Sequence, residues 1–307
     1  MHTAFISHPD CLLHEMGAYH PECPARLKAI ENELITSGLM DKLERHVAPL
    51  VTLEQLKRVH ATKYIASLEA SAPVTGIAYL DPDTAMNPHS LKVAYRAAGS
   101  VVLAVDLVMD GKVDNAFCSV RPPGHHAERD RAMGFCLFNN IAVGMAHAIQ
   151  AHALERVAVV DFDVHHGNGT EDIFRDDPRV MMVSTFQHPF YPCSVVAERS
   201  QRMVNVPLAA GSNGEKFRAA VTDIWLPALH KFKPQMLFIS AGFDAHRDDD
   251  LASLNLLETD YAWVTQRIKE IAREYARNRI VSSLEGGYAL PALGRSVAAH
   301  LQVLSDL

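Results

Sequence analysis

Three residues of metal-ligating type follow one apolar run at alternating positions. Asp161, Asp163 and His165 stand at i, i+2 and i+4, so an extended backbone would direct all three side chains to one side. Two carboxylates and an imidazole suit zinc or a similar borderline divalent ion. Asp244 follows another apolar run and could complete a three-ligand set that leaves a position for water. In the alternative interpretation, Asp163 caps the end of the strand and His165 is a loop histidine with no metal-binding role.

Two adjacent histidines could supply acid–base chemistry beside such a metal. His125 and His126 follow a Pro-Pro-Gly turn, and Asp161 and Asn168 are available as hydrogen-bond acceptors. Amide hydrolysis needs a general base for the water and a general acid for the leaving amine. A carboxylate partner favours the charged imidazolium and a neutral amide does not, so the two histidines could divide these roles. Without these partners, two adjacent histidines would be explained by a structural role or by chance.

Tyr288 could stabilise an oxyanion. It follows Gly286 and Gly287, and such a pair permits close backbone approach and mobility. A phenol opposite a Lewis acid polarises a carbonyl, although a tyrosine in this context can also be a packing residue. Cys136, in G-F-C-L-F, is interpreted as a small buried hydrophobe because no base is placed by sequence to activate it.

Alternating strands and helices must position these residues. The predicted strands are Thr3–Ser7, Asn115–Val120, Arg156–Asp161, Val180–Thr185, Met236–Ser240 and Ile280–Leu284. The predicted helices are Pro24–Ser37, Leu53–Val59, Ser90–Met109, Phe138–His152, Gly214–Phe232, Thr259–Arg277 and Pro291–Leu304. This order predicts βαβ crossovers and one α/β domain with a mostly parallel sheet. The residues of interest follow strands, which is where open α/β sheets place their sites.

Composition excludes several classes of protein. The 307 residues are 48% apolar and 21% charged, as expected for a soluble globular chain rather than a disordered or fibrous one. The net charge of −7 and the absence of a basic run argue against binding nucleic acid or an anionic membrane surface. The longest nearly apolar run, Ala97–Met109, is interrupted by Asp106 and is too short to span a bilayer. No signal peptide is visible, and the five scattered cysteines predict a reduced, cytoplasmic location.

Taken together, the motifs resemble the zinc-dependent histone deacetylase family of the arginase/deacetylase superfamily. They occur in the family's order: H-P-E-C-P-A-R-L (20–27), R-P-P-G-H-H-A-E (121–128), G-F-C-L-F-N-N (134–140), D-F-D-V-H-H-G-N-G-T-E (161–171), S-A-G-F-D (240–244) and E-G-G-Y (285–288). The resemblance implies a three-layer α/β/α fold and a single catalytic domain over residues 1–307. An arginase-like two-metal site is disfavoured, because His166 and Gly167 replace a second aspartate after D-x-H. The R-P-P-G-H-H-A-E and G-F-C-L-F-N-N motifs and Asn168 place the chain with bacterial class II-like deacetylases.

The resemblance also implies roles for individual residues. The zinc ligands would be Asp163, His165 and Asp244; Fe(II) or Co(II) would fit the same donors. Asn168, where the family more often has Asp, is consistent with His126 as general base and then general acid. His125, backed by Asp161, would be its electrostatic partner, and Tyr288 the oxyanion donor. Walls of an acyl-lysine tunnel match Gly134, Phe135 and Tyr191, the last usually Phe in the family. A structural potassium site matches Asp161, Asp163, His165, Ser184 and Thr185, and a second one aligns less closely with Phe174, Asp177 and Val180.

Two substrate classes remain open for this family. Polyamine-preferring members resemble one another in an acidic residue seven positions after the last zinc-ligating aspartate, and this chain has Leu251 there, at the tunnel. The stretch Asp248–Asp250 nevertheless keeps the rim acidic. The P-E-C at 21–23 is followed at once by P-A-R-L, which leaves no room for the constricting turn of a polyamine-specific branch. We therefore favour deacylation of lysine side chains over hydrolysis of acetylated polyamines.

A third interpretation is a catalytically silent zinc-binding protein that reads acyl-lysine. Such a protein should have lost a zinc ligand, a catalytic histidine or the tyrosine, and this chain retains all of them. The physiological substrate and the acyl chain length stay open, and a homo-oligomer is possible.

Overall fold

One sheet of parallel strands runs through the protein. The computed structural model describes residues 1–193 and 200–307. Eight strands pair in parallel in the order β2-β1-β5-β10-β9-β6-β7-β8. Their bounds are β1 Thr3–Ser7, β2 Glu44–Val47, β5 Asn115–Cys118, β6 Val157–Asp161, β7 Val180–Gln187, β8 Met203–Leu208, β9 Met236–Ala241 and β10 Ile280–Leu284. The predicted parallel sheet is confirmed.

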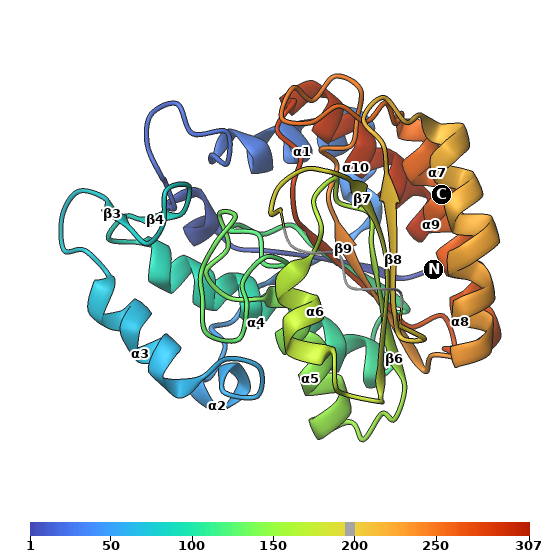
Figure 1. The fold of residues 1–307 in the computed structure, drawn as a ribbon, viewed down its shortest axis with the longest axis horizontal. Helices are drawn as coiled ribbons and strands as arrows, with labels where there is room; N and C mark the ends of the chain where they lie inside the picture. Colours follow the sequence, from blue (N-terminus) through green and yellow to red (C-terminus); the bar gives the residue numbers. More distant parts are fainter. Residues whose placement is uncertain (194–199) are drawn as a thin grey trace.

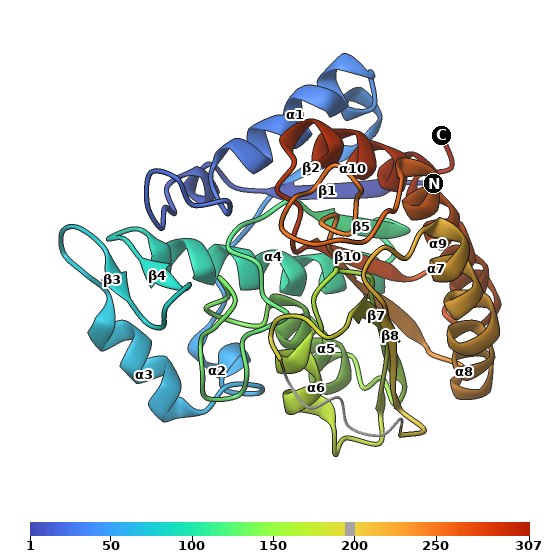
Figure 2. The same ribbon diagram turned by 45° about the horizontal axis from the view of Figure 1, so that its top comes forward.

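Helices cover both faces of this sheet (Figures 1 and 2). One face carries α1 (Ala25–Thr36), α10 (Leu290–Leu304), α9 (Glu258–Tyr275), α7 (Gly214–Ala220) and α8 (Leu226–Phe232). The other carries α4 (Ser90–Met109), α5 (Asn140–Ala151) and α6 (Asn168–Phe174). At the side, away from the sheet, lie α2 (Leu53–Leu56), α3 (Thr62–Ser71) and the hairpin of β3 (Ala78–Tyr79) and β4 (Ala85–Met86). The expected three-layer α/β/α arrangement is therefore present.

Local sequence explains how the central helices begin and pack. The Asn139 side chain accepts a hydrogen bond from the Ala142 N–H at 3.0 Å and so caps α5. The small residues of α4 permit close approach of a neighbouring loop, because a Cβ at Gly99 would overlap the backbone of Pro49. Strand β6 is buried along its whole length, as its continuous apolar run indicates.

Some elements differ from the sequence prediction. The helix expected over Gly214–Phe232 contains a π-helical turn at Val221–Trp225, between α7 and α8. The helix expected over Leu53–Val59 is one turn, α2, after which the chain turns and the Ala61 N–H bonds to the Arg129 carbonyl. Edge strands β2 and β8 and helices α3 and α6 were not predicted; β2 is polar and largely exposed, so no apolar run marks it.

The strand register places the carboxyl-terminal ends of β6, β9 and β10 level with one another. Asp161 pairs with Ser184 on β7 and with Ser240 on β9, and Leu284 on β10 pairs with Ala241. The segments that follow β6, β9 and β10 consequently begin side by side at one edge of the sheet.

Candidate active site

Three metal-ligating side chains converge at this edge. Asp163 and His165 follow β6, and Asp244 follows the neighbouring strand β9. One ligand atom from each lies within 4.8 Å of the other two. The Nδ1 atom of His165 is 3.1 Å from Asp163 Oδ1 and 3.2 Å from Asp244 Oδ2. The structure thus assembles the three residues that were predicted as zinc ligands.

The surroundings of these residues suit a divalent cation. Backbone N–H groups of Val164 and Gly286 donate to Asp244 Oδ1 at 2.9 Å and to Asp163 Oδ2 at 2.8 Å. Asp244 Oδ2 is buried and accepts no well-formed hydrogen bond from the described residues. Burial and the adjacent Asp163 carboxylate raise the pKa of Asp244 to about 6. A bound cation would relieve this repulsion, and two carboxylates with one imidazole form a donor set typical of zinc.

Glycines hold the backbone close against these carboxylates. A Cβ at Gly242 would overlap the carboxylate of Asp163, and one at Gly286 would overlap that of Asp244. Gly242 and Gly286 are therefore required by the space around the ligand group.

The two adjacent histidines have different partners. Nδ1 of His125 lies 3.0 Å from Asp161 Oδ2, and Nδ1 of His126 lies 2.8 Å from Asn168 Oδ1. The Asn168 amide nitrogen donates to Glu128 Oε1 at 2.8 Å, which fixes the amide oxygen towards His126. Each histidine therefore donates its Nδ1 proton to its partner, and the Nε2 atom of a neutral His126 is free to accept a proton.

Electrostatics separate the two histidines further. Burial opposes charge on His125, but the carboxylates of Asp163 and Asp161 outweigh it and raise the pKa of His125 to about 10. Burial, together with the neighbouring His125 and His165, lowers the pKa of His126 well below its usual value. At neutral pH the pair therefore combines a charged His125 with a neutral His126, the arrangement that a base beside an electrostatic partner requires.

A cavity of about 210 Å³ reaches this group. It is lined by Asp83, Pro123, His125, His126, Gly134, Phe135, His165, Phe190, Tyr191, Leu251, Gly286 and Tyr288. All four residues predicted for the tunnel are among them. Its walls are aromatic: the ring centroids of Tyr191 and His126 are 5.2 Å apart, and those of Phe190 and His165 are 5.5 Å apart. Such a narrow apolar channel can hold the methylene chain of a linear amine.

Tyr288 forms part of the wall of this cavity. Its ring stands edge-on to Phe135, with centroids 5.9 Å apart, and the Arg26 guanidinium lies 4.9 Å from the ring centroid. Burial raises the pKa of Tyr288 well above its usual value, so the hydroxyl keeps its proton. The Tyr288 N–H donates to Asp249 Oδ2 at 2.6 Å, and the next N–H, of Ala289, donates to the same oxygen at 3.1 Å.

Two carboxylates that support the site were not found from the sequence. Asp83 Oδ1 accepts hydrogen bonds from Thr84 Oγ1 at 2.7 Å and from the Gly134 N–H at 3.2 Å, and so holds the tunnel wall. Glu285 Oε2 accepts from the N–H groups of Gly124 at 2.6 Å and His125 at 3.1 Å. Burial raises the pKa of Glu285 to about 7. Only Glu285 had a sequence signal, as a charged residue that directly follows an apolar strand.

The residues matched to monovalent-cation sites are placed as follows. Asp161 lies beside Ser184, and the Ser184 hydroxyl is buried without a hydrogen-bond partner in the described part of the chain. Thr185 is the next residue of β7. Of the second set, the carbonyls of Asp177 and Val180 accept from Arg202 Nη1 at 2.6 and 3.5 Å, and the Phe174 carbonyl accepts from the Asp177 N–H at 3.0 Å. A guanidinium therefore already supplies positive charge at those carbonyls.

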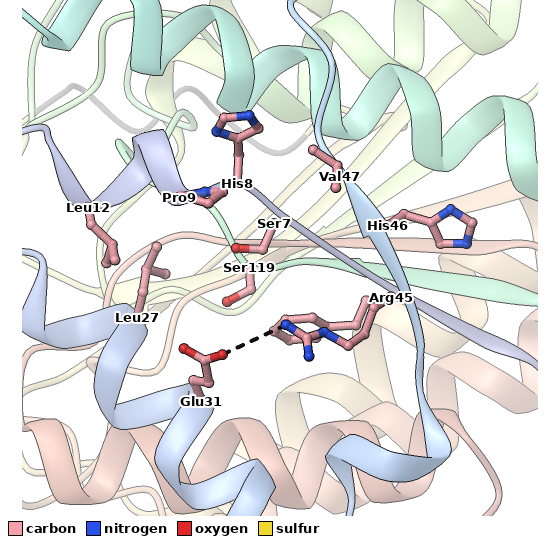
Figure 3. A pocket seen from close by; sticks show the side chains of 11 residues that line it. Ser7, His8, Pro9, Leu12, Leu27, Glu31, Arg45, His46, Val47 and Ser119 are labelled. Atoms are coloured by element: carbon pink, nitrogen blue, oxygen red, sulfur yellow. Dashed lines mark ion pairs between the residues drawn. The ribbon is translucent and has the colours of Figure 1, made fainter.

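A larger cavity lies apart from the predicted site residues. It has a volume of about 310 Å³ and opens where β1 and β2 end, with Arg45 and Glu31 forming an ion pair at 4.0 Å across it (Figure 3). None of the predicted site residues lines it. Within residues 1–193 and 200–307, no helix combines the length and the apolar character needed to cross a bilayer.

The chain is similar to known proteins over most of its length. Residues 20–304 match the family described as histone deacetylase domain. An uncharacterized protein of Synechocystis is 40% identical and aligns with 98% of this chain and 99% of its own length. A histone deacetylase-like amidohydrolase of Pseudomonas aeruginosa is 36% identical, with 97% of this chain and 86% of the relative aligned. The crystal structure of the HDA15 HD domain superposes with a TM-score of 0.94 at 34% identity, covering 99% of this chain and 88% of that one.

Proposed function

Because the chain belongs to the histone deacetylase family, we propose that it is a zinc-dependent amidohydrolase that removes acetyl or other acyl groups from the ε-amine of lysine. Residues 1–307 would form one catalytic domain. The observation that carries the proposal is the convergence of Asp163, His165 and Asp244 beside a charged and a neutral histidine in one aromatic cavity. No residue needed for hydrolysis is missing, which disfavours a silent acyl-lysine reader.

The residues divide the hydrolysis between them. Zinc held by Asp163, His165 and Asp244 would supply the Lewis acidity that activates water and polarises the acyl carbonyl. The neutral His126 takes a proton from the attacking water and returns it to the departing amine. The charged His125 stabilises negative charge nearby, and the protonated Tyr288 hydroxyl donates to the oxyanion. Fe(II) or Co(II) would suit the same donors.

A potassium ion beside Asp161 is part of this proposal. The Ser184 hydroxyl beside Asp161 supports it, because a buried hydroxyl oxygen without a hydrogen-bond partner among the described residues is costly unless a cation satisfies it. The Asp177 and Val180 carbonyls already accept from Arg202, which disfavours a second potassium ion there.

Two features of the cavity bear on the substrate. Leu251 lines it and offers no charge to a second amine, which supports an acyl-lysine substrate. Asp83 also lines it, and its carboxylate could pair with a cationic amine, so an acetylated polyamine is the second candidate.

The deciding experiment compares kcat/KM for an acetyl-lysine peptide and an acetylated polyamine on metal-quantified protein. A preference of tenfold or more for the peptide is expected. A tenfold preference for the polyamine would instead identify acetylated polyamines as the substrate class. If zinc-loaded protein binds the peptide but hydrolyses neither substrate, the protein is a catalytically silent acyl-lysine reader.

A further inference from the structure

A second group of metal-ligating side chains lies at the far end of α5 from the candidate active site. Asn139, at the start of α5, bonds to the Ala127 carbonyl beside His126 at 3.2 Å. His152 directly follows the last residue of α5, which has 12 residues and is therefore about 18 Å long. His152 meets His147 of the same helix and Asp106 of α4 there.

The donor atoms of this group are close to the spacing of a metal site. Nε2 of His147 and Nε2 of His152 each lie 2.8 Å from Asp106 Oδ1. One ligand atom from each residue lies within 4.8 Å of the other two, as in the active-site group. Ligands of a tetrahedral zinc ion stand about 3.3 Å apart, given metal–ligand bonds of about 2.0–2.1 Å. A small outward movement of the imidazoles would therefore admit an ion.

Water has access to this group. The side chains of Asp106 and His152 are 43% and 20% exposed, and that of His147 is 9% exposed. A bound ion could thus complete its coordination with water. Two imidazoles and one carboxylate are the donor set of borderline divalent metals, whereas Mg²⁺ and Ca²⁺ prefer oxygen alone.

We propose that Asp106, His147 and His152 form a second, peripheral binding site for a borderline divalent ion such as Zn²⁺, Co²⁺ or Ni²⁺. The site joins the end of α4 to the end of α5, two helices that pack on the same face of the sheet. It is independent of the proposed hydrolysis, because none of its residues lines the catalytic cavity.

Arg58 opposes this site in a way that can be tested. Its Nη1 atom lies 2.9 Å from Nδ1 of His147, and a guanidinium can only donate, so Nδ1 accepts and the His147 proton is on Nε2. A metal at Nε2 would require that proton to move to Nδ1, where it would face the Arg58 donor. Arg58 therefore has to turn away when the ion binds, and it lowers the affinity.

The first experiment counts metal ions per chain. The full-length protein is stripped with a chelator, dialysed against micromolar Zn²⁺ and analysed for bound metal. Wild type is expected to hold two ions per chain, and Asp106→Asn and His152→Ala one each, with His152→Ala retaining wild-type hydrolysis. His46→Ala is the matched control and should keep two ions. Nε2 of His46 pairs with Glu44 Oε1 at 2.8 Å, but no third ligand joins this pair among residues 1–193 and 200–307. A single ion in wild type, or two in both variants, would overturn the proposal.

A second experiment uses Co²⁺ and Arg58. Co²⁺ added to protein that already holds one zinc ion should produce visible d–d absorption, and His152→Ala should lack it. Arg58→Gln replaces the opposing donor with a group that can accept the Nδ1 proton, so it should tighten the second ion about tenfold. Unchanged or weaker binding in a folded Arg58→Gln protein would remove His147 from the site and overturn the three-ligand assignment.

Discussion

His126 donates its Nδ1 proton to the neutral oxygen of Asn168, 2.8 Å away. Its neighbour His125 faces the Asp161 carboxylate at 3.0 Å instead. Burial of His126 and the Asp163 carboxylate near His125, together with this difference in partner, keep a neutral base next to a charged imidazolium in one buried pair. It also makes Asn168 a residue at which the working pH of the enzyme can be shifted.

Asn168→Asp should move the acidic limb of the kcat/KM profile to higher pH by about one unit. A carboxylate partner favours protonated His126, so more alkaline solution is needed to free the base. Because Asn168 also bonds Glu128, the double variant Asn168→Asp with Glu128→Gln removes the repulsion between the two carboxylates and should show the same shift. An unchanged limb in both variants would mean that His126 is not the titrating base.

Tyr288→Phe should lower kcat by about 10²–10³-fold while zinc content stays at the wild-type level. The phenol supplies one oxyanion donor and no metal ligand, so loss of activity and loss of metal are separable. Turnover and metal content measured on the same preparation check this. Wild-type turnover in the variant would eliminate the oxyanion role.

Asp249→Ala should reduce kcat about tenfold and leave KM nearly unchanged. Asp249 accepts the backbone N–H groups of Tyr288 and Ala289, and loss of such charge-assisted bonds would let the tyrosine drift from its position. If Asp249 acts through Tyr288, the same substitution in a Tyr288→Phe background should have little further effect. Independent, multiplicative losses in the double variant would contradict that coupling.

Leu251→Glu should raise kcat/KM for an acetylated polyamine relative to an acetyl-lysine peptide by about tenfold. The added carboxylate would stand in the cavity wall, where it can pair with a distal ammonium group. Leu251→Gln has the same length without the charge and serves as the control. Equal changes in both variants would attribute the effect to shape.

Stability should fall as the pH decreases from about 6.5 towards 3, partly because of His300. Burial lowers its pKa to about 3. Its two nitrogens are already bonded to Thr265 Oγ1 at 2.6 Å and Ser282 Oγ at 3.0 Å. Between these two pKa values the imidazole is protonated in the unfolded state and neutral in the folded state. The free energy of unfolding therefore falls by about 1.4 kcal/mol for each unit by which the pH decreases. The stabilising contribution of neutral His300 is fully present above the unfolded pKa of 6.5 and is lost as the pH falls towards the folded pKa of about 3.

His300→Gln should flatten that slope in urea unfolding at pH 6.5, 5.5 and 4.5. His230→Gln, whose side chain is 47% exposed, is the control and should retain the wild-type slope. If the free energy of unfolding of His300→Gln still falls with pH as in wild type, buried groups other than His300 cause the pH dependence.

The sequence alone predicts the layered fold and all six candidate catalytic residues. Continuous apolar runs separated by helical patterns specify buried parallel strands, and the period of two in an extended chain placed Asp163 and His165 together. Asp244, His125, His126 and Tyr288 were predicted from their residue types and their positions after strands, and the family resemblance implies the same residues. Local pattern could not mark edge strand β2, because its exposed polar residues carry no burial signal.

Which distant groups meet becomes apparent only in the three-dimensional structure. Asp249 reaches the backbone of Tyr288 across 39 positions, and Asp106 meets His147 across 41. No spacing along the chain encodes such contacts, because they arise from the order of strands in the sheet and the packing of helices upon it. The same packing sets burial and neighbouring charge, which is why the opposite protonation of His125 and His126 follows from the fold.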